Sequence, residues 1–221
     1  SRRQRQMCIR DSFMSSRTRI RGEIGKSFEG SSLFVSFNAT YNALLKERTG
    51  FELREAYLDH RDDNWGFRLG RQLVIWGAAD GVRITDLVSP MDMTEFLAQD
   101  YDDIRMPVNA LRLFVFNDKM KLELLAVPTF EGYKLPTDAI NPWCILPKDS
   151  PLPIAWEENG SHPSLHFANI EYGGKLSFTL PGVDFSLSAL HTWNKMPVFT
   201  YRPTDTPVSY THLRAHETLR Y

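Results

Sequence analysis

Residues 168–189 read ANIEYGGKLSFTLPGVDFSLSA, and this stretch contains the clearest structural signal in the chain. Apolar and polar side chains alternate on both sides of Pro181-Gly182, a dipeptide typical of turns. The apolar positions are Ala168, Ile170, Tyr172, Gly174, Leu176, Phe178 and Leu180, then Val183, Phe185, Leu187 and Ala189. A period of two predicts two β-strands with one apolar face, joined as a hairpin.

The same alternation recurs along the chain and predicts eight strands in all. They are expected at 17–28, 31–42, 51–60, 65–76, 110–116, 119–127, 166–180 and 183–193. Within 51–60 the apolar parity changes between Leu53 and Ala56, which predicts either a β-bulge at that point or a different strand boundary.

The connections between these strands alternate strictly between short and long. Short links are Glu29-Gly30, 61–64, Asn117-Asp118 and Pro181-Gly182, and long links are 44–50, 77–109 and 128–163. Antiparallel bacterial barrels have short turns on the periplasmic side and long loops outside. The pattern predicts an all-β fold: an antiparallel transmembrane β-barrel fragment, about eight strands of a larger barrel, with long extracellular loops in an outer membrane.

Both ends of the chain resemble translated sequencing adapters. Back-translation of residues 2–11 reproduces the first-read adapter of transposase-based libraries, and 208–217 reproduces the reverse complement of the second-read adapter. We therefore expect residues 1–12 and 208–221 to be adapter-derived, and 13–207 to be a partial outer-membrane barrel without its native termini.

Composition excludes several classes of protein. With 26 Lys+Arg against 27 Asp+Glu, the chain has no net charge that would attract nucleic acid. No run approaches the ~18 apolar residues of a transmembrane helix. Cys8 lies in the adapter segment, so Cys144 has no partner for a disulfide within the chain. No cofactor motif is present.

In a barrel, the polar parity of each strand faces the lumen. The predicted lumen-lining residues are Arg19, Arg21, Glu23, Asn38, Arg68, Gln72, Arg112, Lys121, Glu123, Glu171 and Lys175. Alternatively, these groups pair across neighbouring strands and only fill the interior. As a set they favour a polar lumen, because burying many unpaired charges costs several kcal/mol per ion.

The long link 77–109 is rich in acidic residues and could fold inward as a constriction. The candidates are Asp80, Arg83, Asp86, Asp92, Asp102, Asp103 and Arg105, because rings of charged side chains select ions and solutes in pores. The alternative is a solvated extracellular loop with a short helix over 92–98. The spacing matches no EF-hand, so we expect no metal site.

Catalysis has weak candidates. Ser164, His166, His162 and His191 are the residues that a rim-mounted hydrolase would use, but Ser164 and His166 share a strand face without forming a dyad. We therefore expect no catalytic residues and no enzyme. Trp65, Tyr41, Tyr172 and Trp193 fall near predicted strand ends, as interfacial aromatic girdles require.

A stretch in the middle of the chain resembles a known family. It comprises Gly70-Arg71-Gln72, Trp76-Gly77, Asp80-Gly81, Arg83-Ile84-Thr85-Asp86, Pro90 and Asp92, and extends to 53–59 and 102–107. This segment resembles an outer-membrane family that carries the domain-of-unknown-function label 1302. The resemblance implies a larger transmembrane barrel involved in the passage of hydrophobic or poorly permeant compounds, and it implies no catalytic residues.

These observations predict an outer-membrane, porin-like channel for small solutes, hydrophobic compounds among them. Its partners would be outer-membrane lipid and a small-molecule solute, and its oligomeric state is left open. Two alternatives remain at this stage: a soluble periplasmic β-rich binding protein and an outer-membrane lipid hydrolase.

Overall fold

The computed structural model describes residues 16–77, 87–95, 103–145, 167–197, 199–202 and 208–211. Its main feature is one antiparallel sheet with strand order β1-β2-β3-β4-β5-β6-β7-β8, so every strand pairs with its neighbours in sequence. The strands are β1 (Arg17–Phe28), β2 (Ser31–Asn42), β3 (Gly50–Arg61), β4 (Trp65–Gln72), β5 (Val108–Phe116), β6 (Met120–Val127), β7 (Glu171–Leu180) and β8 (Val183–His191). The sheet is open, with β1 and β8 as its edges.

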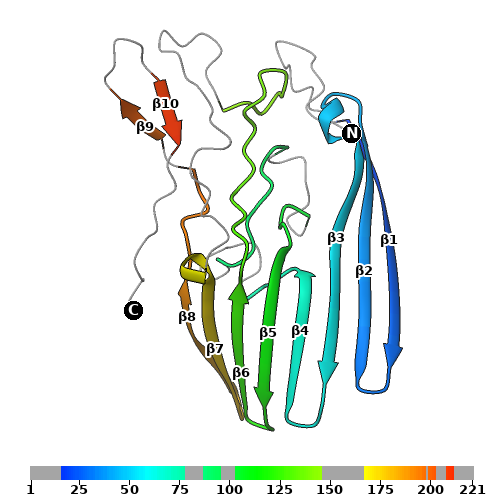
Figure 1. Ribbon diagram of the computed structural model, residues 1–221, viewed down its shortest axis with the longest axis vertical. Coiled ribbons are helices and arrows are strands. Elements are labelled where there is room, and N and C mark those ends of the chain that lie inside the picture. Colours follow the sequence, from blue (N-terminus) through cyan, green and yellow to red (C-terminus); the bar gives the residue numbers. More distant parts are fainter. Residues whose placement is uncertain are drawn as a thin grey trace, which may run out of the picture.

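The hairpin turns lie at one end of the sheet and the long connections at the other (Figure 1). The turns after β1, β3, β5 and β7 are short, and the links after β2, β4 and β6 are long. Gly30 and Gly182 have φ values of 68° and 83°, a region that glycine enters without steric cost. The alternation of short and long connections predicted from the sequence is confirmed.

Register and bulge follow the side-chain pattern. β2 and β3 pair with a register shift between Ser36 and Phe37, whose partners are Glu55 and Leu53. Arg54 is therefore the extra residue of a bulge, which confirms the change of parity predicted between Leu53 and Ala56. The shift keeps Leu53 on the same face as Phe37 and its neighbours.

Two predicted strand boundaries are wrong by four residues or more. The strand expected over 65–76 ends at Gln72, and the chain then leaves the sheet. The strand expected over 166–180 begins at Glu171, after a 3-10 helix η3 (Phe167–Asn169). Alternation alone cannot mark such ends, because a departing segment can keep its apolar pattern when it packs against the sheet.

Smaller elements complete the described chain. A 3-10 helix, η1 (Lys46–Arg48), lies in the link between β2 and β3, and β9 (Phe199–Arg202) pairs antiparallel with β10 (Val208–Thr211) apart from the main sheet. None of the helices in the described ranges is long and apolar enough to cross a membrane. The adapter origin of 1–12 and 208–221 stays a prediction.

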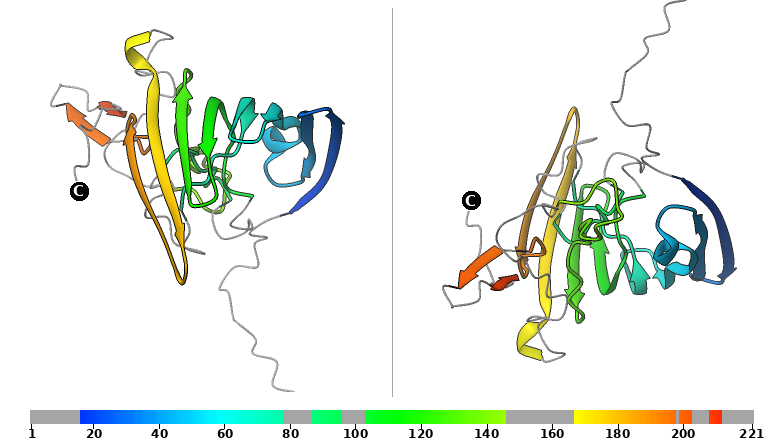
Figure 2. Two further views of the ribbon diagram at one scale, coloured as in Figure 1. Left: turned by 90° about the horizontal axis from the view of Figure 1, so that it is seen from below. Right: turned by 90° about the horizontal axis from the view of Figure 1, so that it is seen from above.

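Viewed along the strands, the sheet is a curved band that runs from β1 to β8 (Figure 2). The described part of the long link that follows β4 lies on the concave side of this curved sheet (Figures 1 and 2). The buried apolar cluster is found there: Val74, Trp76 and Val88 from the link pack on Val108, Ala110, Leu125 and Val127 from β5 and β6. The core of this structure is thus a loop packed on a sheet, not one sheet packed on another.

Candidate functional site

The two faces of the sheet differ sharply in chemistry. We call them the apolar face and the polar face. Every large apolar strand residue that is strongly exposed lies on the apolar face, according to the strand register. These residues are Ile20, Ile24, Phe28, Leu33, Tyr41, Phe51, Leu53, Leu58, Trp65, Leu69, Leu111, Leu113, Val115, Met120, Leu124, Tyr172, Leu180, Val183, Phe185 and Leu187. An exposed apolar surface of this extent marks contact with something other than water.

The polar face carries most of the charged strand residues; Lys26 and Arg71 lie on the apolar face. The register places all of the predicted lumen-lining residues on the polar face: Arg19, Arg21, Glu23, Asn38, Arg68, Gln72, Arg112, Lys121, Glu123, Glu171 and Lys175. Parity alone predicted this shared face, because side chains two residues apart in a strand point the same way. That this face lines a lumen stays a prediction.

The link after β4 folds across the polar face. Ser89 Oγ accepts the backbone N–H of Val74 at 3.0 Å and donates to the carbonyl of the same residue at 3.2 Å. Met91 forms an antiparallel bridge with Arg105, and the backbone N–H of Met106 donates to the carbonyl of Pro90 at 2.8 Å. We call residues 73–77, 87–95 and 103–107 the inserted loop.

Asp103 ties the inserted loop to the first three strands. Its carboxylate lies 2.8 Å from Arg19 Nη1 and 3.6 Å from Arg54 Nη1, and it accepts a hydrogen bond from Arg21 Nη2. Arg21 is itself oriented by a 3.1 Å hydrogen bond from Nε to Asn38 Oδ1. Burial raises the pKa of Asp103, but the hydrogen bond from Arg21 and the three guanidinium charges lower it by more, so the carboxylate stays ionised.

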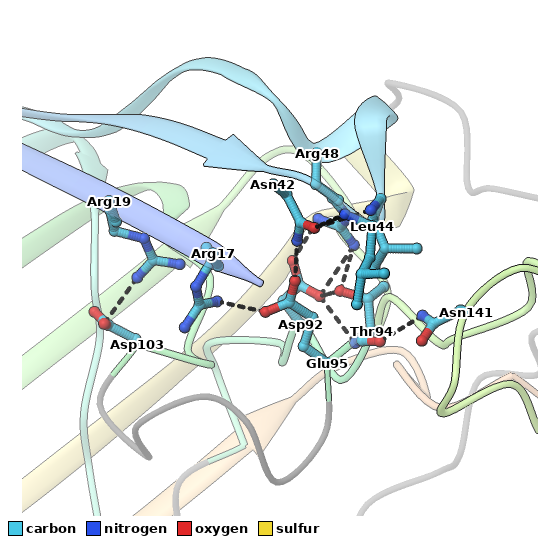
Figure 3. Close-up of polar contacts among 11 residues, drawn as sticks. Arg17, Arg19, Asn42, Leu44, Arg48, Asp92, Thr94, Glu95, Asp103 and Asn141 are labelled. Carbon is cyan, nitrogen blue, oxygen red and sulfur yellow. Dashed lines mark hydrogen bonds and ion pairs between the residues drawn. The ribbon is translucent and has the colours of Figure 1, made fainter. Parts of the chain in front are cut away.

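Asp92 provides a second attachment, shown in Figure 3. Arg48 Nη1 and Nη2 donate to its two carboxylate oxygens at 2.7 and 3.1 Å, in the two-pronged geometry that suits a guanidinium. Thr94 donates to Asp92 from its backbone N–H at 3.1 Å and also from its hydroxyl. Burial raises the pKa of Asp92, but the charge of Arg48 and these hydrogen bonds give a net lowering.

Glu95 provides a third attachment beside it (Figure 3). Its Oε2 lies 3.1 Å from Arg17 Nη1, and its Oε1 accepts a hydrogen bond from Asn42 Nδ2. The Asn42 side chain also accepts the backbone N–H groups of Leu44 and Leu45, at 3.1 and 2.9 Å. The loop is thus held on β1 by a largely buried ion pair and on β2 by a buried, charge-assisted hydrogen bond, which is the stronger kind of hydrogen bond.

The other end of the inserted loop is held by β5, β6 and β7. Trp76 Nε1 donates to Glu123 Oε1 at 2.8 Å, and Lys175 Nζ donates to the Trp76 carbonyl at 2.7 Å. Arg112 contacts the same Glu123 oxygen through Nε and Nη2, both at 2.8 Å. The loop therefore crosses the polar face from β1 to β7.

The constriction candidates fall into two groups. Asp92, Asp103 and Arg105 lie in the inserted loop on the polar face. Asp80, Arg83, Asp86 and Asp102 lie outside the described residues. The alternative of a helix that begins at Asp92 does not fit the described part, since Asp92 bridges to Lys134 and Thr94-Glu95 form a turn.

Several residues that hold the loop, or that form ion pairs with other residues of the polar face, were not predicted. Arg17, Asn42 and Asp59 share the polar parity and could have been found by extending it. Arg54 is the extra residue of the bulge, so parity does not assign it to a face. Arg48, Glu95 and Lys195 lie outside regular strands, where alternation gives no information. Lys195 Nζ contacts Glu171 Oε2 at 2.8 Å, and both side chains are buried.

The residues considered for catalysis do not belong to the polar face in the described part of the chain. His191 stacks on Tyr172 at 4.9 Å on the apolar face, whereas His162, Ser164 and His166 lie outside the described residues. Within the described ranges, no group of three or more His, Cys, Asp or Glu residues could hold a metal ion.

Fold and site together define the class: an all-β protein with one antiparallel meander sheet, an apolar face, and a polar face crossed by an inserted loop. Residues 9–138 match the family described as a protein of unknown function (DUF1302). The match spans more than half of the chain, so the protein belongs to this family, as its sequence motifs indicated. A search of curated proteins found no match, and neither did a search of solved structures.

Proposed function

We propose that this chain is part of an outer-membrane β-barrel channel for small solutes. One observation carries the proposal: the sheet exposes its large apolar side chains on one face and gathers most of its charged side chains on the other. Full burial of a large apolar side chain contributes ~1.5–3 kcal/mol, so the apolar face strongly favours an apolar surrounding. Lipid is the surrounding that meets this requirement over a whole curved sheet.

The strand lengths and the turns support the same proposal. The strands are 8 to 12 residues long, near the ~9–11 residues that a tilted strand needs to span a bilayer. Unpaired strand edges cannot face lipid, so β1 and β8 would pair with further strands or with each other in the membrane.

The inserted loop would determine which solutes pass through the channel. In a closed barrel, the polar face lines the lumen and the loop narrows it through residues anchored at Asp92, Glu95 and Asp103. Charged groups at a narrowing select solutes by charge and size. The conduit would therefore suit small solutes.

The first experiment asks whether the full-length parent protein is an outer-membrane barrel. Expressed with its own signal sequence, it should fractionate with outer membranes and migrate differently on gels with and without heating. Extraction without detergent as a soluble periplasmic product would contradict the proposal and favour a periplasmic binding protein.

The second experiment tests the channel itself. The parent is reconstituted in planar bilayers, and ion selectivity is compared before and after Asp102→Asn with Asp103→Asn. A shift in selectivity is expected, and Asp118→Asn in the short β5–β6 turn is the matched control. An unchanged selectivity would refute the role of the loop, and a complete lack of conductance would refute the channel.

A further inference from the structure

From the Trp76 end of the inserted loop toward the short turns, the polar face has an excess of positive charge. The excess lies on β3 to β7. It begins at the register partners Asp59, Arg68 and Arg112 and extends toward the short turns. We call it the basic band, and its charged members are Arg61, Arg68, Arg112, Lys121 and Lys175, with Asp59 and Glu123. Five cations thus face two carboxylates.

Both carboxylates are already engaged. Asp59 Oδ2 accepts Arg68 Nη2 at 2.8 Å and lies 3.5 Å from Arg61 Nε. Glu123 is shared between Arg112 and the indole N–H of Trp76. The remaining positive charge therefore has no carboxylate of its own within the band.

The cations are also placed close to one another. Arg68 and Arg112 are direct register partners on adjacent strands, an arrangement of like charges that is unfavourable by itself. Lys121 forms no ion pair within the described residues; Glu123 attracts its charge, and Arg112, Arg61 and Lys175 repel it. A bound anion would relieve this repulsion, and more strongly in a narrow conduit than in open water.

Accessibility changes gradually along the band. The Arg61 side chain is 64% exposed near the short turns, and Lys121 is also exposed. Arg68 and Arg112 lie deeper, with 19% and 12% of their side chains exposed. Within the band, an anion would therefore lie between exposed cations on the short-turn side and pre-oriented guanidinium groups deeper on the sheet.

Aromatic rings lie directly beside these cations. The Arg68 guanidinium stands 4.3 Å from the Tyr57 ring centre, and Lys121 Nζ stands 4.9 Å from that of Phe114. Guanidinium groups match the two oxygens of a carboxylate, and the rings offer an apolar surface next to it. This combination suits a carboxylate with an apolar body better than a strongly hydrated inorganic anion.

We propose that the basic band is a binding site for small organic carboxylates on the solute path. The inference rests on the proposed channel and names its solute class. Arg68 and Arg112 would hold the carboxylate, and Lys121 would donate a further charge-assisted hydrogen bond to it from the short-turn side.

The test is calorimetric titration of the purified full-length parent with benzoate. Lys121→Gln should weaken benzoate binding by about tenfold, the loss of one charge-assisted hydrogen bond, and Lys121→Arg should restore it. Lys121 is exposed and has no ion pair in the described chain, so its replacement leaves the Arg112–Glu123 contact intact. The control is Lys26→Gln, which removes the same charge from the apolar face.

Three results would overturn the inference: benzyl alcohol binding as tightly as benzoate, inorganic phosphate binding as tightly, or Lys26→Gln weakening benzoate equally. The proposed channel fails separately. Benzoate binding that depends on Lys121, in a protein that conducts no ions, would uphold the carboxylate site and refute the channel. Conductance without benzoate binding would do the reverse.

Discussion

The apolar and polar faces are built from the same strands and differ only in the parity of their residues. Leu113 and Arg112 are consecutive in β5, yet Leu113 is 42% exposed while the Arg112 side chain is 12% exposed and paired with Glu123. In a protein dissolved in water, the burial of these two residues would be reversed. The difference indicates that the apolar face favours an apolar surrounding. The polar face is instead covered by polar groups of the inserted loop, which pair with its charged side chains.

The sharpest way to break this comparison is to place a charge on the apolar face. In the proposed barrel, Leu113→Arg should destabilise the folded parent by ~2–4 kcal/mol, because a charge in mid-strand would lie in the hydrocarbon region. Urea unfolding in phospholipid vesicles, followed by the gel shift between folded and unfolded forms, measures the change.

The matched control is Ser186→Arg, an exposed position on the polar face of β8. It should change the unfolding free energy little, since its side chain would face the aqueous side. Equal losses from both substitutions would show that the two faces do not differ in surroundings.

A smaller effect is expected from releasing the inserted loop. Asp103→Asn removes the charge that Arg19, Arg21 and Arg54 share, and should weaken the docking of the loop by about 1–3 kcal/mol. Arg105 is buried when the loop is docked, so tryptic cleavage after Arg105 should become faster. Asp118→Asn in a turn should leave the cleavage rate unchanged.

The smallest effect on loop docking should come from lowering the pH, because acid protonates only part of the carboxylates that hold the loop. The pKa of Asp103 is lowered from 3.8 in the folded protein, and so is that of Asp92. These groups therefore stabilise the docked loop at pH values above about 3.8, and the contribution is lost as the pH falls through the depressed pKa values. Conductance fluctuations recorded between pH 6 and pH 3 should increase only below this point, and an increase between pH 5 and pH 7 would contradict the assignment.

The sequence predicted most of the sheet. Alternation along 31–42 and 183–193 fixes which side chains share a face, since this follows from local backbone geometry. The bulge at Arg54 was one of two predicted alternatives, because it shows as a break in parity beside Leu53. Strand ends were predicted less well: residues 73–76 form a continuous apolar run after β4 that was assigned to the strand, but they belong to the inserted loop.

The contacts across the polar face could not be predicted in this way. Arg21 and Asp103 are 82 residues apart, and Trp76 and Glu123 are 47 apart. Neither pair leaves a periodic signal, and the inward and outward positions of the loop were both open from the sequence. Arg48 and Asp92 both lie outside regular strands, where no rule of spacing relates them.

By itself, then, the sequence determined the strands, their alternating faces, the order of short and long connections, and the family. Each of these follows from residues that are close in the chain. The tertiary structure alone decided that the loop after β4 lies on the polar face, which arginines hold Asp103, and where cations are left in excess. Those features depend on long-range charge pairing and on burial, which arise only when distant segments of the chain come together.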